Sequence, residues 1–293
     1  MPQHVLVPLD GSDHSFAGLE YSLASFPDAT LTAVFVVDPT HDATVGTSES
    51  TRDRAEDDGE RVLDRAVDRA EADGRELRTQ LRTGTPHTEI LAVASETDVD
   101  HVVLGSHGES PIKRPFLGHV SEAVVRRAPV STTVVPETAA AVRDRELPGS
   151  IRVPVDGSEQ AEAALAYALE TFPDATHTAL HVQELPFDRP RSEIQGTYLE
   201  ETLRSYEERS AEILEAATAL ADDRGMTLET ETAAGKPAQA IVDDADTNDY
   251  DQIVMGSHGR SLADRLLTGT VAERVARRSP RTVTLVRGAP VED

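Results

Sequence analysis

Two loops that suit the binding of an anion occur twice along the chain. The first, Val7-Pro-Leu-Asp-Gly-Ser12, recurs as Val153-Pro-Val-Asp-Gly-Ser158, and the second, Gly105-Ser-His-Gly108, recurs as Gly256-Ser-His-Gly259. In the second copy, Gly269-Thr270 follows after nine more residues. Glycines let a backbone approach an anion closely, and a helix that begins at Thr270 would present free N–H groups to a phosphate. The spacing indicates a phosphate site, although the same glycines would also suit plain strand-to-helix turns.

The repeated loops indicate a tandem duplication. The two Asp-Gly-Ser loops lie 146 residues apart, and the two Gly-Ser-His-Gly loops lie 151 residues apart. A period near 150 residues has the size of a domain rather than of a solenoid repeat. We therefore expect one domain over residues 1–137, a linker rich in alanine and charge over 138–149, and a second domain over 150–293.

Each half alternates segments of strand and helix character. In the first half, His4–Leu9 has the pattern of a buried strand, and Phe16, Leu19 and Leu23 then follow at helical spacing. The apolar run Leu31–Val37 is typical of a strand that is buried on both faces. Strands and helices keep alternating to a fifth strand, and parallel strands need crossover connections. Each half is therefore predicted to be an α/β domain, with a five-stranded parallel sheet and helices on both faces.

The repeated loops fall where such a fold binds its ligands. Open α/β sheets bind ligands beyond the carboxyl ends of their strands, at the point where the strand order reverses. The loops follow the first and fourth predicted strands of each half. Asp10 and Asp156 come just after the first strand, where an aspartate either contacts a ribose or a metal-bound phosphate, or only caps the next helix. His107 and His258 stand between glycines and are expected to shape their loops rather than to titrate in catalysis.

The combined pattern resembles the universal stress protein (UspA) family. It reads Gly-x2-Gly-x9-Gly-Ser/Thr after a buried strand, with Val-Pro-x-Asp-Gly-Ser upstream, and the two copies cover nearly the whole chain. The resemblance implies two tandem Rossmann-like domains of the adenine nucleotide alpha hydrolase-like type, which bind ATP with Mg2+. In the second domain it implies nucleotide contacts from Pro154, Asp156, Val182, Met255, Gly256, His258, Gly259, Gly269, Thr270 and Val271.

The first domain departs from this pattern at one position. His119 stands where the family has serine or threonine, so a small hydroxyl is lost and an imidazole is added at the start of a helix. We therefore expect the first domain to bind nucleotide more weakly than the second. The positions that the resemblance implies in the first domain are Pro8, Asp10, Val36, Leu104, Gly105, His107, Gly108, Gly118, His119 and Val120.

The charge balance argues against a nucleic-acid partner. The 293 residues include 53 acidic and 28 basic side chains, a net charge of -25, and no run of basic residues that a nucleic-acid binder would need. Only two of the basic residues are lysines, Lys113 and Lys236. Because salt screens self-repulsion at such a charge, we expect a saline cytosol, as in a halophilic archaeon; the alternative is a soluble acidic protein of an ordinary cytosol.

Composition also limits the chemistry that is available to the protein and the cellular compartments that are expected for it. The absence of cysteine excludes a disulfide framework, a zinc-thiolate site and a thiol nucleophile. The start of the chain has no signal-peptide pattern, and no apolar run approaches the roughly 20 residues that span a bilayer. We expect a soluble, cytoplasmic protein that does not bind membranes.

Three kinds of function remain open at this point. The chain has no P-loop motif, no kinase signature and no Gly-x-Gly-x-x-Gly after its first strand, so evolved catalysis is not expected and no catalytic residue is assigned. An ATP-binding regulatory or stress-response module is favoured. The alternatives are a nucleotide-dependent enzyme, such as a slow ATPase or a phosphotransferase, and a nucleotide-free interaction platform.

The last predicted strand of each half bears on assembly. Val130–Val135 and Thr282–Val286 are short and uncharged, and each would lie at a sheet edge, where unpaired backbone groups invite pairing. Relatives of this family dimerise through that region. We therefore expect either an internal pseudo-dimer of the two halves or a homo-oligomer through the last strands.

Overall fold

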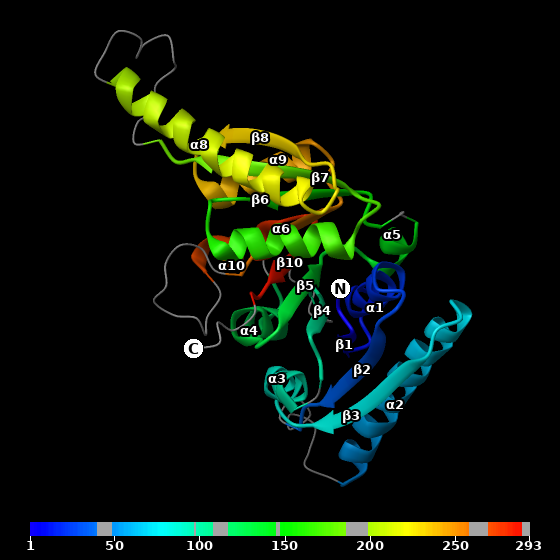
Figure 1. Ribbon diagram of the computed structural model, residues 1–293. Helices are drawn as coiled ribbons and strands as arrows, with labels where there is room; N and C mark the ends of the chain where they lie inside the picture. Colours follow the sequence, from blue (N-terminus) through cyan, green and yellow to red (C-terminus); the bar gives the residue numbers. More distant parts are fainter. Residues whose placement is uncertain are drawn as a thin grey trace.

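A computed structural model of the chain describes residues 1–39, 49–96, 98–107, 117–144, 147–185, 199–257 and 269–288. In the first half, strands and helices alternate in the predicted order (Figure 1). The elements are β1 (His4–Leu9), α1 (Asp13–Ser25), β2 (Thr30–Val37), α2 (Glu49–Ala72), β3 (Leu77–Thr83), α3 (Pro86–Glu96), β4 (His101–Gly105), α4 (His119–Arg127) and β5 (Ser131–Val135).

The second half repeats this order after a short helix. That helix is α5 (Ala139–Arg143), and the elements that follow are β6 (Ser150–Pro154), α6 (Glu159–Thr171), β7 (Thr176–Gln183), α8 (Leu199–Asp222), β8 (Glu229–Ala234), α9 (Pro237–Thr247), β9 (Gln252–Gly256), α10 (Thr270–Arg278) and β10 (Thr282–Val286). Each half thus contains the predicted α/β domain with five parallel strands.

The two five-stranded sheets join into one. The strand order is β3-β2-β1-β4-β5-β10-β9-β6-β7-β8, and β5 and β10 pair antiparallel at its centre. Thr133 pairs with Thr284, and Val134 pairs with Val283. The last strands of the two halves therefore pair with each other within one chain, which is the first of the two arrangements that the sequence left open.

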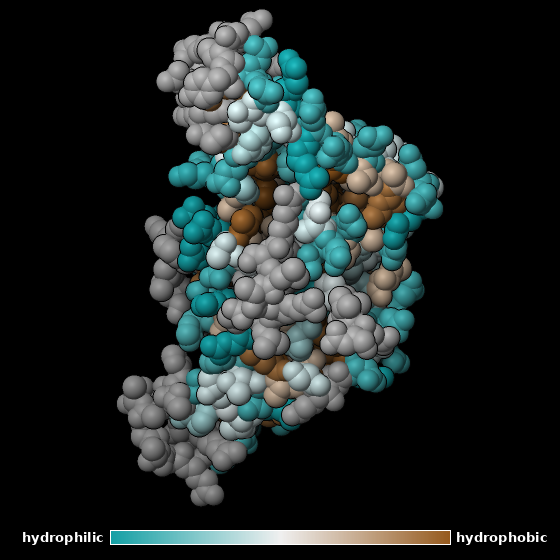
Figure 2. All heavy atoms as spheres, turned by 60° about the vertical axis from the view of Figure 1, so that its left-hand side comes forward, coloured by the Kyte–Doolittle hydropathy of each residue, from teal (hydrophilic) through white to brown (hydrophobic). Residues whose placement is uncertain are grey.

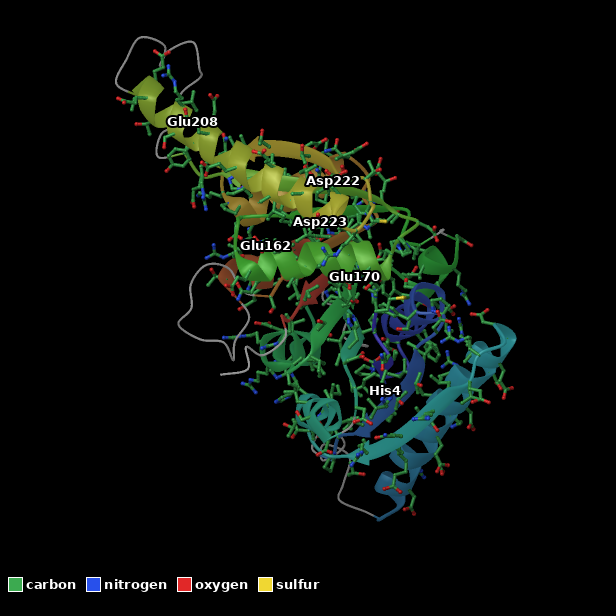
Figure 3. All side chains as sticks on the ribbon, viewed as in Figure 1. His4, Glu162, Glu170, Glu208, Asp222 and Asp223 are labelled. Carbon is green, nitrogen blue, oxygen red and sulfur yellow. The ribbon has the colours of Figure 1, made fainter. Side chains whose placement is uncertain are left out.

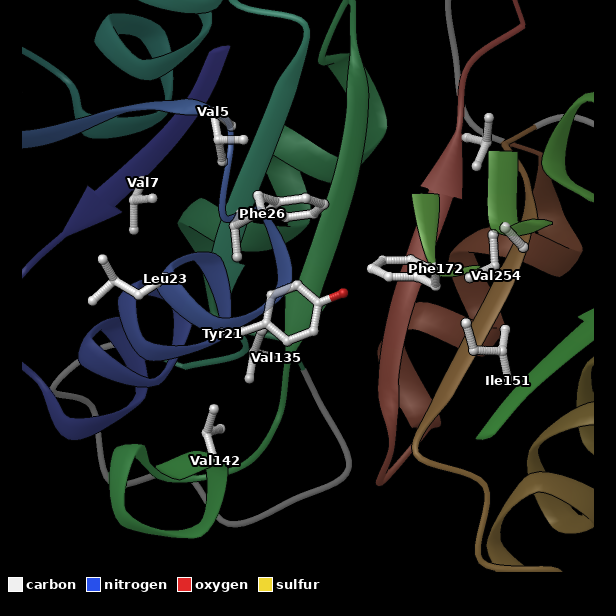
Figure 4. Close-up of a cluster of buried hydrophobic side chains, with 14 of the residues drawn as sticks. Val5, Val7, Tyr21, Leu23, Phe26, Val135, Val142, Ile151, Phe172 and Val254 are labelled. Carbon is white, nitrogen blue, oxygen red and sulfur yellow. The ribbon is translucent and has the colours of Figure 1, made fainter. Parts of the chain in front are cut away.

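Helices cover both faces of this sheet and bury one hydrophobic core on each. One core receives Leu19 of α1, Leu63 of α2, Leu165 of α6 and Ile213 of α8. The other core receives side chains of α3, α4, α9 and α10, namely Ile90, Val124, Ile241 and Val275. Each core contains residues of both halves, and in Figure 4 Tyr21 and Phe26 of the first half lie beside Phe172 and Val254 of the second. Burial of apolar surface therefore holds the halves together as well as each domain.

The predicted linker is partly structured. Within residues 138–149, the Thr138 side chain accepts a hydrogen bond from the Ala141 backbone N–H, and α5 begins there. The helix packs against α1, and Val142 is only 2 % exposed. Residues 138–149 thus contain a short helix between the two halves, which was not predicted from the sequence; it is too short to be stable by itself, and burial of Val142 against α1 anchors it.

Acidic side chains cover the outer helices of the second half. Glu162 and Glu170 of α6, and Glu208 and Asp222 of α8, are all exposed (Figure 3). On the face seen in Figure 2, hydrophilic side chains likewise make up most of the described surface. Among the described residues, no helix is both long and apolar enough to cross a membrane.

Candidate functional site

The strand order has one switch point in each half, which is where open α/β sheets bind ligands. In the first half the order reverses between β1 and β4, and in the second half it reverses between β6 and β9. The loops after these four strands carry the repeated motifs. We refer to the carboxyl ends of β1 and β4 as the first crevice and to those of β6 and β9 as the second crevice. Strands of the two halves run in opposite directions at the β5–β10 junction, so the crevices lie at opposite ends of the joined sheet.

The aspartate of each first loop organises the start of the next helix. Asp10 Oδ1 accepts hydrogen bonds from the Ser12 backbone N–H at 3.0 Å and from the Ser12 hydroxyl at 2.6 Å. Asp156 Oδ1 makes the same two bonds to Ser158, at 3.0 Å and 2.6 Å. Each serine in turn caps its helix by accepting from the N–H three residues later. The aspartates thus close the turn before each helix and hold the serine that caps it, which neither requires nor excludes a contact of their other carboxylate oxygen with a ligand.

The glycine that ends β4 and the glycine that ends β9 are required by the packing of a helix against the end of the strand. A Cβ atom on Gly105 would lie 2.3 Å from the His14 carbonyl oxygen, and one on Gly256 would lie 2.8 Å from the Gln160 carbonyl oxygen. Both distances are far shorter than a van der Waals contact. These glycines let the first turn of α1 or α6 pack directly against the end of β4 or β9.

Backbone hydrogen bonds bring the two ends of each glycine loop together. The Gly118 N–H donates to the Ser106 carbonyl at 2.8 Å, and the Gly269 N–H donates to the Ser257 carbonyl at 2.7 Å. The Ser106 and Ser257 N–H groups in turn donate to the last residues of β5 and β10. The start of α4 or α10 is therefore held directly beside the end of β4 or β9.

The first turns of α4 and α10 lack the side-chain cap that α1, α5 and α6 have, and the first turn of α9 lacks it too. The N-cap residues are Gly118 and Gly269, and neither helix receives a side-chain capping bond. By contrast α1, α5 and α6 are each capped by a serine or threonine hydroxyl. Uncapped N-terminal N–H groups carry positive partial charge that suits an anion. His119 and Thr270, the first residues of the two helices, are exposed at these ends.

Six of the predicted site residues lie on one face of the sheet. Val36, Val120, Val182 and Val271 are half-buried and pack against the core under α3, α4, α9 and α10, and Leu104 and Met255 belong to that core. Pro8 and Pro154 lie in the last two residues of β1 and β6. Three predicted residues, Gly108, His258 and Gly259, lie outside the described residues.

Histidines distinguish the first crevice from the second. The His107 Nδ1 lies 2.8 Å from the Ser106 hydroxyl, and its ring centroid lies 5.6 Å from that of His14. The His119 ring lies 6.0 Å from the His87 ring, edge to face. At the positions that match His14, His87 and His119, the second half has Gln160, Ala238 and Thr270. Within the described ranges, no group of three or more His, Asp or Glu side chains is placed to hold a metal ion.

Comparison with known proteins identifies the family. The family model of the universal stress protein family matches residues 1–136 and 149–287. The chain belongs to the universal stress protein family. The two matches coincide with the two α/β halves of the sheet, so this universal stress protein is a tandem member with two domains.

Its relatives include single-domain and two-domain universal stress proteins. It is 29% identical over 136 residues to universal stress protein MJ0531 of Methanocaldococcus jannaschii, which covers 45% of this chain and 80% of that protein. It is 24% identical over 304 residues to a universal stress protein of Mycolicibacterium smegmatis, covering 97% of this chain and 96% of the relative. A universal stress protein structure from Archaeoglobus fulgidus DSM 4304 matches with a TM-score of 0.71 at 25% identity, over 97% of this chain and 98% of that one.

Sequence reasoning missed the residues that join the two domains of this universal stress protein. Tyr21 of α1 donates a hydrogen bond to Gln252 of β9 at 2.7 Å, and the hydroxyls of Thr133 and Thr284 lie 2.6 Å apart. A signal was present, because Tyr21 recurs as Tyr167 and Thr133 recurs as Thr284 at the offsets of the duplication. The junction residues could have been found by looking for polar residues that recur in both copies within segments that are otherwise apolar.

Proposed function

We propose that this universal stress protein is an ATP-binding regulatory module, in which the nucleotide occupies the crevices at the ends of the sheet. One observation carries the proposal: the first turns of α4 and α10 have no side-chain cap, and backbone hydrogen bonds hold them beside the glycine that ends β4 or β9. Uncapped helix N-termini next to a closely packed glycine suit a phosphate chain. Membership of the family favours ATP among the possible anions.

The proposed contacts follow from where the residues lie. In the second crevice, the N–H groups of Thr270 and Val271 would bind phosphate, and the position of Asp156 just after β6 suits the ribose. Val182, half-buried at the end of β7, would contact the adenine through its backbone. Asp10, Val36, His119 and Val120 would do the same in the first crevice. Mg2+ would arrive with the nucleotide, since its phosphates supply oxygen ligands that the described residues of the crevice do not gather by themselves.

The proposed role is binding rather than turnover. Hydrolysis or phosphoryl transfer needs a positioned base and metal ligands around the γ-phosphate. Within the described part of the chain, no cluster of three potential metal ligands is present. Occupancy of the crevices would then bias contacts with a protein partner, and the exposed acidic helices offer the surface for such contacts. Release of phosphate at several turnovers per second by the purified protein would contradict this role.

A charge placed at the start of α10 tests the proposal. Thr270 is the exposed first residue of that helix, so Thr270→Asp adds a carboxylate that the helix dipole favours, and the fold should be preserved. The same carboxylate would repel a phosphate at the helix N-terminus. We expect calorimetric titration in molar KCl to show that Thr270→Asp weakens ATP binding at the second crevice at least tenfold.

The control keeps the hydroxyl. Thr270→Ser should bind ATP within about twofold of the wild type. Equal affinity in wild type and Thr270→Asp would place the nucleotide elsewhere, and absence of heat with all three proteins would favour a nucleotide-free platform.

The two crevices are expected to differ in affinity, and the chain offers the exchange that tests it. His119→Thr places in the first crevice the residue that the second crevice has. Removing the imidazole from the exposed start of α4 should strengthen the weaker of two calorimetric binding events by several-fold and leave the stronger one unchanged. A loss of affinity in His119→Thr would show instead that the imidazole donates to the phosphate.

The setting that we infer is a saline cytoplasm. Self-repulsion at a net charge of -25 destabilises a compact chain in dilute buffer and opposes the binding of a polyanion. The use of only two lysines is a second unusual feature of this surface. At 1 M salt the Debye length is only about 3 Å, so the distant carboxylates are screened while contacts inside a crevice persist. The calorimetric titrations are therefore to be carried out in molar KCl.

A further inference from the structure

A chain of six polar side chains crosses the junction between the two halves. Tyr21 donates to Gln252 Oε1 at 2.7 Å, and Gln252 Nε2 donates to the Thr284 hydroxyl at 2.8 Å. Thr284 and Thr133 are bonded through their hydroxyls at 2.6 Å. His101 Nε2 lies 2.8 Å from the Thr133 hydroxyl, and its Nδ1 lies 3.4 Å from the Tyr167 hydroxyl. Figure 4 shows the Tyr21 hydroxyl pointing toward the second half, where this junction chain continues.

The junction chain follows the symmetry of the duplication, with one exception. Tyr21 and Tyr167 occupy matching positions, as do Thr133 and Thr284, and each tyrosine contacts the opposite half. The exception is the pair His101 and Gln252, which also match by position. One of two equivalent places therefore carries a titratable group, and the other carries a neutral amide that makes comparable bonds.

His101 is in an environment that suits only its neutral form. The side chain is fully buried, and its ring stacks on Tyr167 with centroids 6.0 Å apart and planes 11° apart. The Phe26 ring is a second neighbour of the His101 ring, with centroids 5.3 Å apart. A neutral imidazole that accepts from the Tyr167 hydroxyl and donates to Thr133 satisfies both ring nitrogens. An imidazolium would bury a charge among neutral groups.

The titratable groups around His101 in the described part of the chain do not compensate such a charge. Burial raises the pKa of Tyr21 and of Tyr167 on the packed helices, so neither ionises in acid. Asp100, which precedes β4, directs its carboxylate to the backbone N–H groups of Gln3 and His4 on the β1 side. Burial lowers the pKa of His101 from 6.5 to about 3.

We propose that the junction chain is an acid-sensitive latch between the two halves, in which protonation of His101 favours their separation at β5 and β10. A histidine whose pKa is lowered by folding stabilises the closed junction fully above pH 6.5, and this contribution is lost as the pH falls toward 3. Each pH unit in that window increases the opening constant by up to about tenfold. Opening would expose two unpaired strand edges at the centre of the sheet.

Hydrogen exchange on the full chain tests the latch. The variant replaces His101 by glutamine, the residue at the matching position of the other half. In molar KCl, and after correction for the intrinsic exchange rate, amides of Ser131–Val135 and Thr282–Val286 should exchange up to about fiftyfold faster at pH 4.5 than at pH 6.5 in the wild type. His101→Gln, which copies Gln252, should reduce this increase to less than about threefold.

A second buried histidine supplies the control. Burial also lowers the pKa of His177 in β7, away from the junction, and Leu31 is the matching residue of the first half. His177→Leu should keep the acid response of β5 and β10. The latch is wrong if His101→Gln responds like the wild type, or if exchange at β5 and β10 in the wild type does not rise in acid. Should His101→Gln fail to fold, NMR of the wild-type imidazole decides: His101 must remain neutral at pH 5, and titration near pH 6.5 contradicts the latch.

Discussion

Replacing Arg152 with leucine is expected to destabilise the second half by about 3–5 kcal/mol. Arg152 on β6 is 0% exposed, and its guanidinium contacts Glu231 and Asp244 at 2.6 Å each. Its Cζ lies 4.2 Å from the centre of the Tyr250 ring. Without the arginine, Asp244, which is 17% exposed, is left as a carboxylate with no positive partner at this site. The measurement is the unfolding midpoint in guanidinium chloride.

The first half shows how to reverse that loss. At the positions that match Arg152 and Asp244, it has Leu6 and Val93, both fully buried. The double variant Arg152→Leu, Asp244→Val should therefore regain most of the stability that the single variant loses, because it replaces an ion pair by apolar packing of a kind the fold already accepts. A double variant as unstable as Arg152→Leu alone would show that the loss comes from packing of the arginine stem rather than from the stranded carboxylate.

Gly105→Ala is expected to have the second large effect. Its new methyl group would lie 2.3 Å from the His14 carbonyl oxygen, so α1 and β4 would have to move apart at the first crevice. Overpacking against backbone typically costs about 1–3 kcal/mol, and we expect the upper part of that range here. The melting temperature of the protein is the readout.

Two other glycines calibrate the result. Gly256→Ala places its methyl group 2.8 Å from the Gln160 carbonyl oxygen, so its effect should be smaller than that of Gly105→Ala. Gly288→Ala meets nothing within 4 Å and should be neutral. Equal melting temperatures for Gly105→Ala and Gly288→Ala would contradict the close packing of α1 on β4.

Much of the fold could be predicted because its signals are local. The runs His4–Leu9 and Leu31–Val37 are apolar enough to mark strands buried on both faces, and the observed β1 and β2 agree with them within one residue. The duplication then carried each prediction to the second half. The helix α5 was missed because its order depends on Val142 packing against α1, a contact that five residues of sequence do not display.

The contacts that distinguish the two halves were not predictable in the same way. Arg152 lies in a segment that is plainly a strand, but its partner Glu231 is 79 residues away in the sequence. The glycines of the crevices were predicted to approach a phosphate, and the packing of Gly105 and Gly256 against the first turns of α1 and α6 was not predicted. Sequence periodicity reports which face of an element is buried, and it does not report which groups meet across a sheet.

The backbone amides at the start of α10 give the most direct test of nucleotide binding in the crevices. In a two-dimensional 1H–15N spectrum of the wild-type chain in molar KCl, addition of ATP with Mg2+ should shift the resonances of Gly269, Thr270 and Val271 in a saturable way. Those of Met255 and Gly256 at the end of β9 should shift with them. If these amides remain unchanged at 10 mM ATP, a concentration about ten times above a weak millimolar affinity, or if shifts occur only away from both crevices, the proposed site is wrong.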